Sequence, residues 1–109
     1  MSLRFLGRSL FLAVLASPAL VRADEAADKR WKLYEPSFEA FAEADRANAF
    51  PPGGILFVGS SIFRQWANLA RQMAPLPVLN RAFGGSRAGD QLARFDQLVP
   101  RYAPRIIVY

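Results

Sequence analysis

Apolar side chains recur at helical spacing in the first half of the chain and in short continuous runs in the second half. In residues 24–50 the aromatic side chains lie three or four positions apart, as on one face of an amphipathic helix: Trp31, Tyr34, Phe38 and Phe41. We expect this face to pack in the core. Proline lacks the N–H that a helix interior requires, so Pro36 predicts two helical pieces or a kink.

Three apolar runs bounded by glycine or proline are typical of short strands buried on both faces: residues 55–58, 77–80 and 105–109. Helical spacing predicts helices over residues 61–73 and about 88–98. The first helix is expected to share one apolar face: Ile62, Trp66, Leu69 and Met73. The second is expected to turn another face inward: Leu92, Phe95 and Val99. Strands that alternate with helices predict an α/β fold with a parallel sheet.

The N-terminus has the three parts of a secretory signal peptide. Two arginines precede the apolar run 10–16, and small residues follow it, so residues 1–23 are predicted to be removed after Ala23, with Ala19 as a second possible site. We therefore expect export to the periplasm or medium of a bacterium. An uncleaved membrane anchor is the weaker alternative, because the run is much shorter than the ~20 residues of a bilayer span, and no stable membrane insertion is expected after processing.

Processing also changes the charge of the chain. The full sequence carries a formal net charge of +5, and removal of three arginines with residues 1–23 leaves 11 basic and 9 acidic residues, a net charge of +2. The basic residues form no cluster, which argues against a nucleic-acid partner. No cysteine is present to form a disulfide, and we expect no cofactor and no metal.

Two polar, glycine-containing loops follow the first two predicted strands: GSS after ILFV, and NRAFGGSRAGD after PVL. In an open parallel sheet, ligands bind at the carboxyl ends of the strands. A serine between a strand and a helix is most often a helix cap, so capping and nucleophilic catalysis are both open for this serine pair. Asp90 and Asp96 are expected to have surface or capping roles, since the sequence contains no histidine through which a carboxylate could act.

The blocks ILFVGSSIFRQW, NRAFGGS and PRIIVY, taken in order, resemble the SGNH (GDSL-like) hydrolases over residues 31–109. These are exported ester hydrolases with a three-layer α/β/α, flavodoxin-like fold. The resemblance implies that Ser61 is the nucleophile and that Ser60, where the family usually has Asp, holds the turn by hydrogen bonding. It also implies that Gly85 donates its backbone N–H to the oxyanion.

Two further blocks of the family, G-x-N-D and D-x-x-H, are missing from the sequence. The resemblance therefore implies an incomplete domain over residues 24–109, truncated after the third strand, with a helical segment 24–50 and β-α-β-α-β units in 51–109. The complete protein is expected to cleave a small-molecule ester, such as an acetylated sugar or a lysophospholipid, and this chain alone is expected to be inactive. A non-catalytic binding module and a gene fragment with the same fold are the alternatives.

Overall fold

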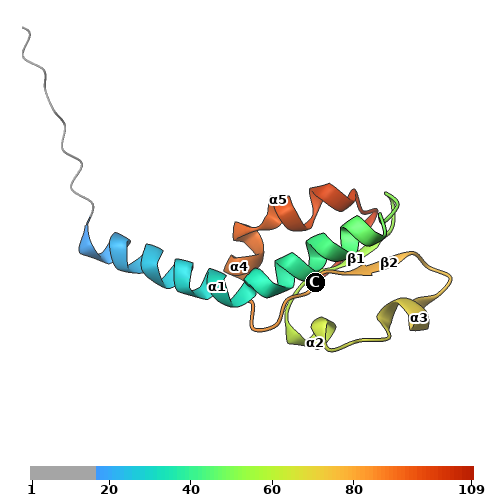
Figure 1. Cartoon of the computed structure of the whole chain (residues 1–109), viewed down its shortest axis with the longest axis horizontal. Helices are drawn as coiled ribbons and strands as arrows, with labels where there is room; N and C mark the ends of the chain where they lie inside the picture. Colours follow the sequence, from blue (N-terminus) through green and yellow to red (C-terminus); the bar gives the residue numbers. More distant parts are fainter. Residues whose placement is uncertain (1–16) are drawn as a thin grey trace, which may run out of the picture.

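The computed structural model describes residues 17–109 (Figure 1), and the apolar run 10–16 of the predicted signal peptide lies outside the described residues. Short helices alternate with short strands after one long N-terminal helix. The elements are α1 (Pro18–Ala47), β1 (Ile55–Phe57), α2 (Ser61–Arg64), α3 (Leu69–Met73), β2 (Val78–Asn80), α4 (Ala88–Ala93), α5 (Phe95–Leu98), the 3-10 helix η1 (Pro100–Tyr102) and β3 (Ile106–Val108).

The strands form one parallel sheet in the order β2-β1-β3. Leu56 of the central strand is paired with Leu79 on one side and Ile107 on the other. The predicted α/β class and parallel sheet are therefore confirmed, although each strand has only three residues.

Side chains of β1 alternate between two hydrophobic clusters, one on each face of the sheet. Leu56 and Val58 pack with Tyr34 of α1 and with residues of the α4–η1 region, whereas Ile55 and Phe57 pack with Leu69 of α3. Helices thus cover both faces, and Figure 1 shows α1, α4 and α5 on one side of the sheet and α2 and α3 on the other.

The aromatic stripe of α1 packs in the core, as predicted. Tyr34 is 4% exposed, and its ring lies edge-on to that of Phe83 at 4.8 Å. Of the two outcomes predicted for Pro36, the division into two helices is wrong, since α1 runs uninterrupted through it. The helix bends between its two ends in Figure 1, as the predicted kink allows. The aromatic side chains before and after Pro36 pack against the same cluster. Their burial offsets the hydrogen bond lost at proline, which costs roughly 3 kcal/mol.

The predicted helix 61–73 is divided into α2 and α3. Leu69 is buried, but Ile62 is 83% exposed and Trp66 38% exposed, so the predicted inward face is wrong at those two positions. Phe63 takes the place of Ile62, with its ring edge-on to Phe57 at 5.1 Å. Because α2 ends at Arg64 and α3 begins at Leu69, the apolar residues predicted to share one helix face do not lie on one helix.

The predicted helix 88–98 is also divided, at Arg94, into α4 and α5. Arg94 leaves the helical conformation, and its guanidinium carbon lies 3.5 Å from the centroid of the Trp31 ring. The break changes which side chains face inward. Leu92 and Phe95 are exposed, contrary to prediction, whereas Leu98 and Val99 are buried.

β3 was expected to be buried on both faces and is instead an edge strand with Ile106 and Ile107 about half exposed. The prediction is wrong because β3 pairs on one side only among the described strands.

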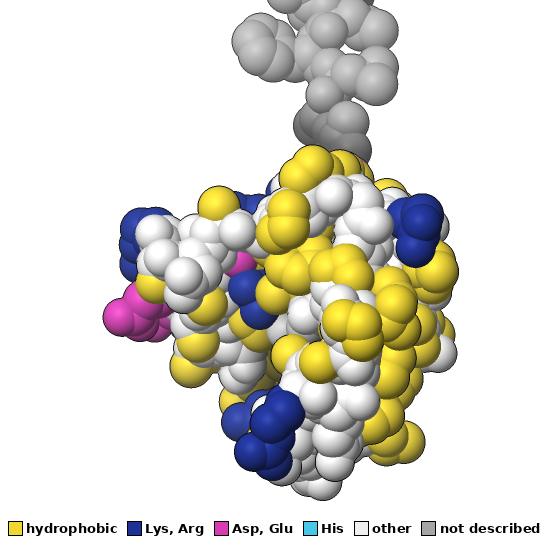
Figure 2. Space-filling model, turned by 90° about the vertical axis from the view of Figure 1, so that its right-hand side faces the viewer, with side chains coloured by type: hydrophobic (Ala, Val, Ile, Leu, Met, Phe, Trp, Pro, Cys, Tyr) yellow, Lys and Arg dark blue, Asp and Glu magenta, His cyan; other side chains and the backbone are white. Residues whose placement is uncertain are grey.

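Hydrophobic side chains also gather on the end of the molecule seen in Figure 2, with Lys and Arg toward its margins. In residues 17–109 no helix is long and apolar enough to cross a membrane.

Candidate functional site

The two polar loops lie at the same edge of the sheet. β1 and β2 are parallel neighbours, and their last residues, Phe57 and Asn80, are paired in register. The serine pair therefore follows one strand directly beside the loop that follows the other. Topology alone brings Ser60 and Ser61 to the neighbourhood of Gly85.

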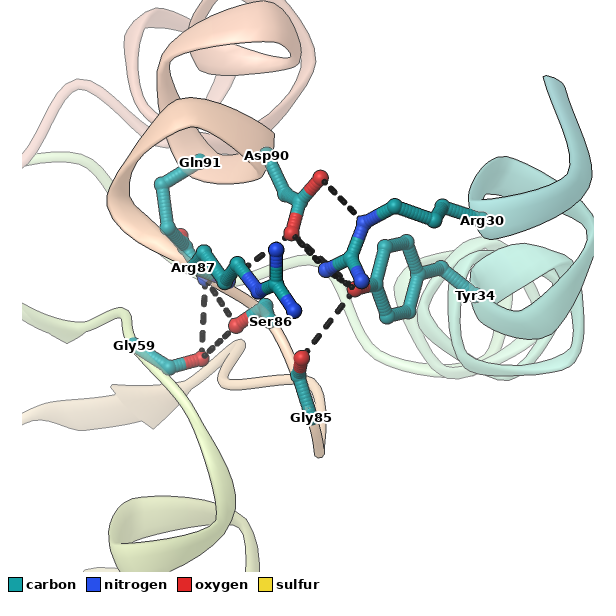
Figure 3. Close-up of polar contacts among 8 residues, drawn as sticks. All are labelled: Arg30, Tyr34, Gly59, Gly85, Ser86, Arg87, Asp90 and Gln91. Carbon is teal, nitrogen blue, oxygen red and sulfur yellow. Dashed lines mark hydrogen bonds and ion pairs between the residues drawn. The ribbon is translucent and has the colours of Figure 1, made fainter. Parts of the chain in front are cut away.

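The carbonyl oxygen of Gly59 joins the loops (Figure 3). It accepts hydrogen bonds from the backbone N–H of Phe83 at 3.0 Å, from Ser86 Oγ at 3.1 Å and from Gln91 Nε2 at 2.9 Å. Gln91 is buried and also donates to Ser86 Oγ at 2.8 Å. Gly59 has φ 138°, which other residues rarely adopt, so glycine is needed for its carbonyl to hold this position.

Ser61 is the first residue of α2, and Ser60 precedes it at the N-cap position. The Ser60 side chain makes no capping hydrogen bond, so the capping interpretation is wrong for this pair. The backbone carbonyls of Ser60 and Ser61 accept from the N–H groups of Arg64 and Gln65. The Ser61 residue is exposed, and its hydroxyl has no hydrogen-bond partner among residues 17–109.

Gly85 lies exposed in the second loop with φ 77°. A Cβ built on Gly85 would meet no atom within 4 Å, so the space beside its backbone is open. The start of this loop is fixed by Asn80, whose Oδ1 accepts from the N–H of Ala82 at 3.0 Å and whose Nδ2 donates to the carbonyl of Phe63 at 2.6 Å. The second of these bonds again connects the glycine loop with the helix of the serine pair.

Tyr34 connects α1 to the glycine loop (Figure 3). Its hydroxyl lies 3.1 Å from the carbonyl oxygen of Gly85 and 3.0 Å from Asp90 Oδ2, and it accepts from Arg30 Nη2 at 2.7 Å. The same Asp90 oxygen accepts from Arg30 Nη2 at 2.7 Å and from the N–H of Arg87 at 2.9 Å. One carboxylate thus holds the long helix, the glycine loop and the start of α4 together.

These contacts shift two pKa values. Hydrogen bonding from Arg30 is the main cause that lowers the pKa of Asp90 from 3.8 to about 2, with further bonds from Arg87 and Tyr34 acting in the same direction. Burial, and then the Asp90 carboxylate, raise the pKa of the Tyr34 hydroxyl. Near neutral pH Asp90 is therefore ionised and Tyr34 protonated, the states in which each contact is favourable.

A second buried network supports the other end of the glycine loop. Arg81, 8% exposed, donates to Asp45 Oδ1 at 2.6 Å and to the Tyr102 hydroxyl at 3.0 Å, and Tyr102 donates to Asp45 Oδ2 at 2.7 Å. Partial burial acts to raise the pKa of Asp45, but the hydrogen bonds from Arg81 and Tyr102 outweigh it and lower that pKa. Arg81 follows β2 directly, so this network fixes the strand end to α1 and η1.

Sequence reasoning missed the part that Tyr34 and Arg30 take in this site. The sequence pattern predicts Tyr34 only as a core residue and indicates no role for Arg30, because partners 51 to 60 positions away leave no local pattern. Asp90 does cap the Arg87 N–H, as one of its expected roles, but it also forms the ion pair with Arg30. The site thus combines an exposed serine, whose hydroxyl has no partner among residues 17–109, with an open glycine loop at the same sheet edge, and the sequence contains no histidine.

Among residues 17–109, no group of three His, Cys, Asp or Glu side chains lies close enough to hold a metal ion. Compared with known proteins, the chain matches no family model, no curated protein and no solved structure.

Proposed function

We propose that this chain is the N-terminal, nucleophile-bearing part of an exported SGNH-type ester hydrolase with a three-layer, flavodoxin-like fold. The main observation in support of this proposal is the junction at Gly59, whose carbonyl accepts three hydrogen bonds from the loop and helix that follow β2. This junction keeps the serine pair and the glycine loop at one sheet edge. Acyl transfer needs a nucleophile beside donors for an oxyanion, and the shared sheet edge of the two loops supports that role for them.

In the proposed reaction, Ser61 Oγ attacks the carbonyl carbon of the ester while a base removes its proton. The backbone N–H groups of Ser61 and Gly85 then donate to the oxygen that becomes negative, each contributing about 3 to 4 kcal/mol to the rate. The C–O bond to the alcohol breaks as the alcohol oxygen is protonated, and water hydrolyses the acyl-serine. Support for Gly85 comes from its positive φ and from the open space beside its backbone.

The base is the part that this sequence does not supply, because the 109 residues contain no histidine. We place it, together with the second oxyanion donor block, on sequence downstream of Tyr109, in the motifs G-x-N-D and D-x-x-H. The substrate is a small-molecule ester, for which an acetylated sugar and a lysophospholipid are the two candidates. Without the base, the 109-residue chain is expected to show little serine-dependent turnover.

A non-catalytic binding module is the second candidate, and the lack of histidine favours it. Such a module would keep the sheet and both loops but would acylate no serine. The two candidates differ in what the coding sequence contains after Tyr109. Both missing motifs there support the hydrolase, and a stop codon or unrelated sequence supports the module or a gene fragment.

The test uses the protein extended by its downstream sequence. Ser61→Ala is expected to abolish both turnover of a short-chain aryl ester and labelling by an organophosphonate. Ser60→Ala is the matched control and should retain both, because the Ser60 side chain makes no capping bond that its removal would break. A phosphonate adduct on Ser60, or wild-type turnover in Ser61→Ala, would refute the proposal.

A further inference from the structure

A cavity of about 400 Å³ lies between α1 and the segment that contains α2 and α3. This volume is within the range of small-ligand sites. Most of its wall is apolar: Pro36, Ala40, Phe41, Leu69, Ala70 and Ala82. The indole of Trp66, which is 38% exposed, lines the cavity where it meets solvent.

Arg64 supplies the only charge among the described residues that line this cavity. Its guanidinium forms no ion pair or hydrogen bond within residues 17–109, unlike those of Arg30 and Arg81, which are paired with carboxylates. Among residues 17–109, no Asp or Glu lines the cavity to neutralise it. An unpaired guanidinium above an apolar wall is complementary to a ligand with an apolar body and one anionic group.

Arg64 also places the cavity next to the proposed catalytic loops. Ser61 and Arg64 are three positions apart in α2, and residues at that spacing lie on the same face of a helix. A Cβ built on Gly84 would lie 3.0 Å from Arg64 Cδ and 3.6 Å from its Nε, so the Arg64 side chain lies against the glycine loop. Asn80 and Ala82, which lead into that loop, line the cavity as well.

We propose that this cavity binds the apolar part of a small anionic ester and that Arg64 binds the carboxylate or phosphate of that ester. As a statement about a substrate, the inference rests on the proposed ester hydrolysis, but binding itself does not need the reaction. Arg64 then determines specificity, since a neutral ester of the same shape leaves its charge without a partner.

The test measures binding by the ¹⁵N-labelled 109-residue chain, with the indole N–H signal of Trp66 and the amide of Ala82 as reporters. The probes are hexanoate and butyl phosphate, and neutral hexanamide is the matched comparison. Saturable binding of either anion, tighter than that of hexanamide, is expected, and the tighter of the two identifies the anionic group. Arg64→Gln should weaken the anion by about tenfold and leave hexanamide unchanged.

Two further variants keep the test specific. Arg71→Gln removes an exposed charge of nearby α3 that does not line the cavity, and it should leave affinity within about twofold. Ala40→Phe places a ring at an exposed position of the wall and should abolish binding of all three probes. Shifts that do not saturate, equal affinity for hexanoate and hexanamide, or equal losses in Arg64→Gln and Arg71→Gln would overturn the inference.

Ser61→Ala separates this inference from the proposed reaction. It should bind hexanoate as the wild type does, because Ser61 does not line the cavity. Anion binding by the 109-residue chain, without acylation of Ser61 in the protein extended by its downstream sequence, refutes the hydrolase alone. Acylation of Ser61 without Arg64-dependent binding refutes the anionic substrate alone.

Discussion

Replacing Asp90 by Asn should destabilise the fold in a way that depends on pH. The substitution keeps the size of the side chain and an oxygen acceptor for the Arg87 N–H, but it removes the charge that Arg30 binds at 2.7 Å. The pKa of Asp90 is held at about 2, against an ordinary value of 3.8. At about 1.4 kcal/mol for each pKa unit, this difference bounds its contribution to the free energy of unfolding at about 2.5 kcal/mol.

Solvent reduces that bound, because the Asp90 and Arg30 side chains are 21% and 31% exposed. We therefore expect Asp90→Asn to lower the free energy of unfolding by about 1 to 2 kcal/mol at pH 7. A lowered carboxylate pKa stabilises the native state fully above the unfolded pKa, and this contribution is lost as the pH falls through the native pKa. The difference between wild type and Asp90→Asn should thus shrink from about pH 5 downward and be about 0.5 kcal/mol or less at pH 2.

Urea denaturation followed by circular dichroism at pH 7, 5, 3 and 2 measures this difference. Asp45, whose pKa is also lowered, contributes to the acid sensitivity of both proteins and cancels in the comparison. Asp96→Asn is the matched control, because Asp96 is exposed and forms no ion pair among the described residues, so its effect should stay within about 0.5 kcal/mol. A pH-independent difference, or equal effects of the two substitutions, would refute the role assigned to the Arg30–Asp90 pair.

Three other predictions follow from glycine conformation, burial and the signal segment. Gly85→Ala should cost about 1 to 2 kcal/mol of unfolding free energy because of its φ of 77°, whereas Gly89→Ala, within α4 and facing open space, should be neutral or stabilising by up to about 1 kcal/mol. In urea denaturation, Leu98→Ala should cost about 2 to 5 kcal/mol and Leu92→Ala less than about 0.5, and similar costs would contradict the observed break in the helix. A reporter fused behind the predicted signal segment should be exported with a new N-terminus, by Edman sequencing, at Asp24, or at Leu20 if the second site is used. A full-length fusion kept in the membrane would favour an anchor instead.

The order of the elements could be predicted from sequence because the apolar runs were short and clearly bounded. Residues 55–58, for example, read as a buried strand between glycines, and β1 is the fully buried centre of the sheet. Because the first two strands are parallel neighbours, the loops that follow them must leave the sheet at the same edge. The placement of both loops at one sheet edge therefore followed from topology.

The limits of helices could not be predicted in the same way. Pro36 suggested two helical pieces or a kink, and packing on both sides of it keeps one helix. Regular spacing suggested an unbroken helix over residues 88–98, but that helix breaks at Arg94. The local sequence pattern reflects helix propensity, whereas the position at which a helix ends also depends on tertiary contacts such as that of Arg94 with Trp31. The Arg30–Asp90 pair was hidden for the same reason, because its members lie 60 positions apart.

The central claim, that Ser61 is the nucleophile, is tested most directly by mapping acetyl transfer from 4-nitrophenyl acetate to the 109-residue chain with and without imidazole. Imidazole supplies the base that the sequence lacks, so peptide mass analysis should find an acetyl group on Ser61 that accumulates only when imidazole is present. Acetylation of Lys29 and Lys32 should be the same in wild type and Ser61→Ala and serves as the internal reference. An acetyl group on Ser60, or a Ser61 that reacts no faster than Ser37, would contradict the account.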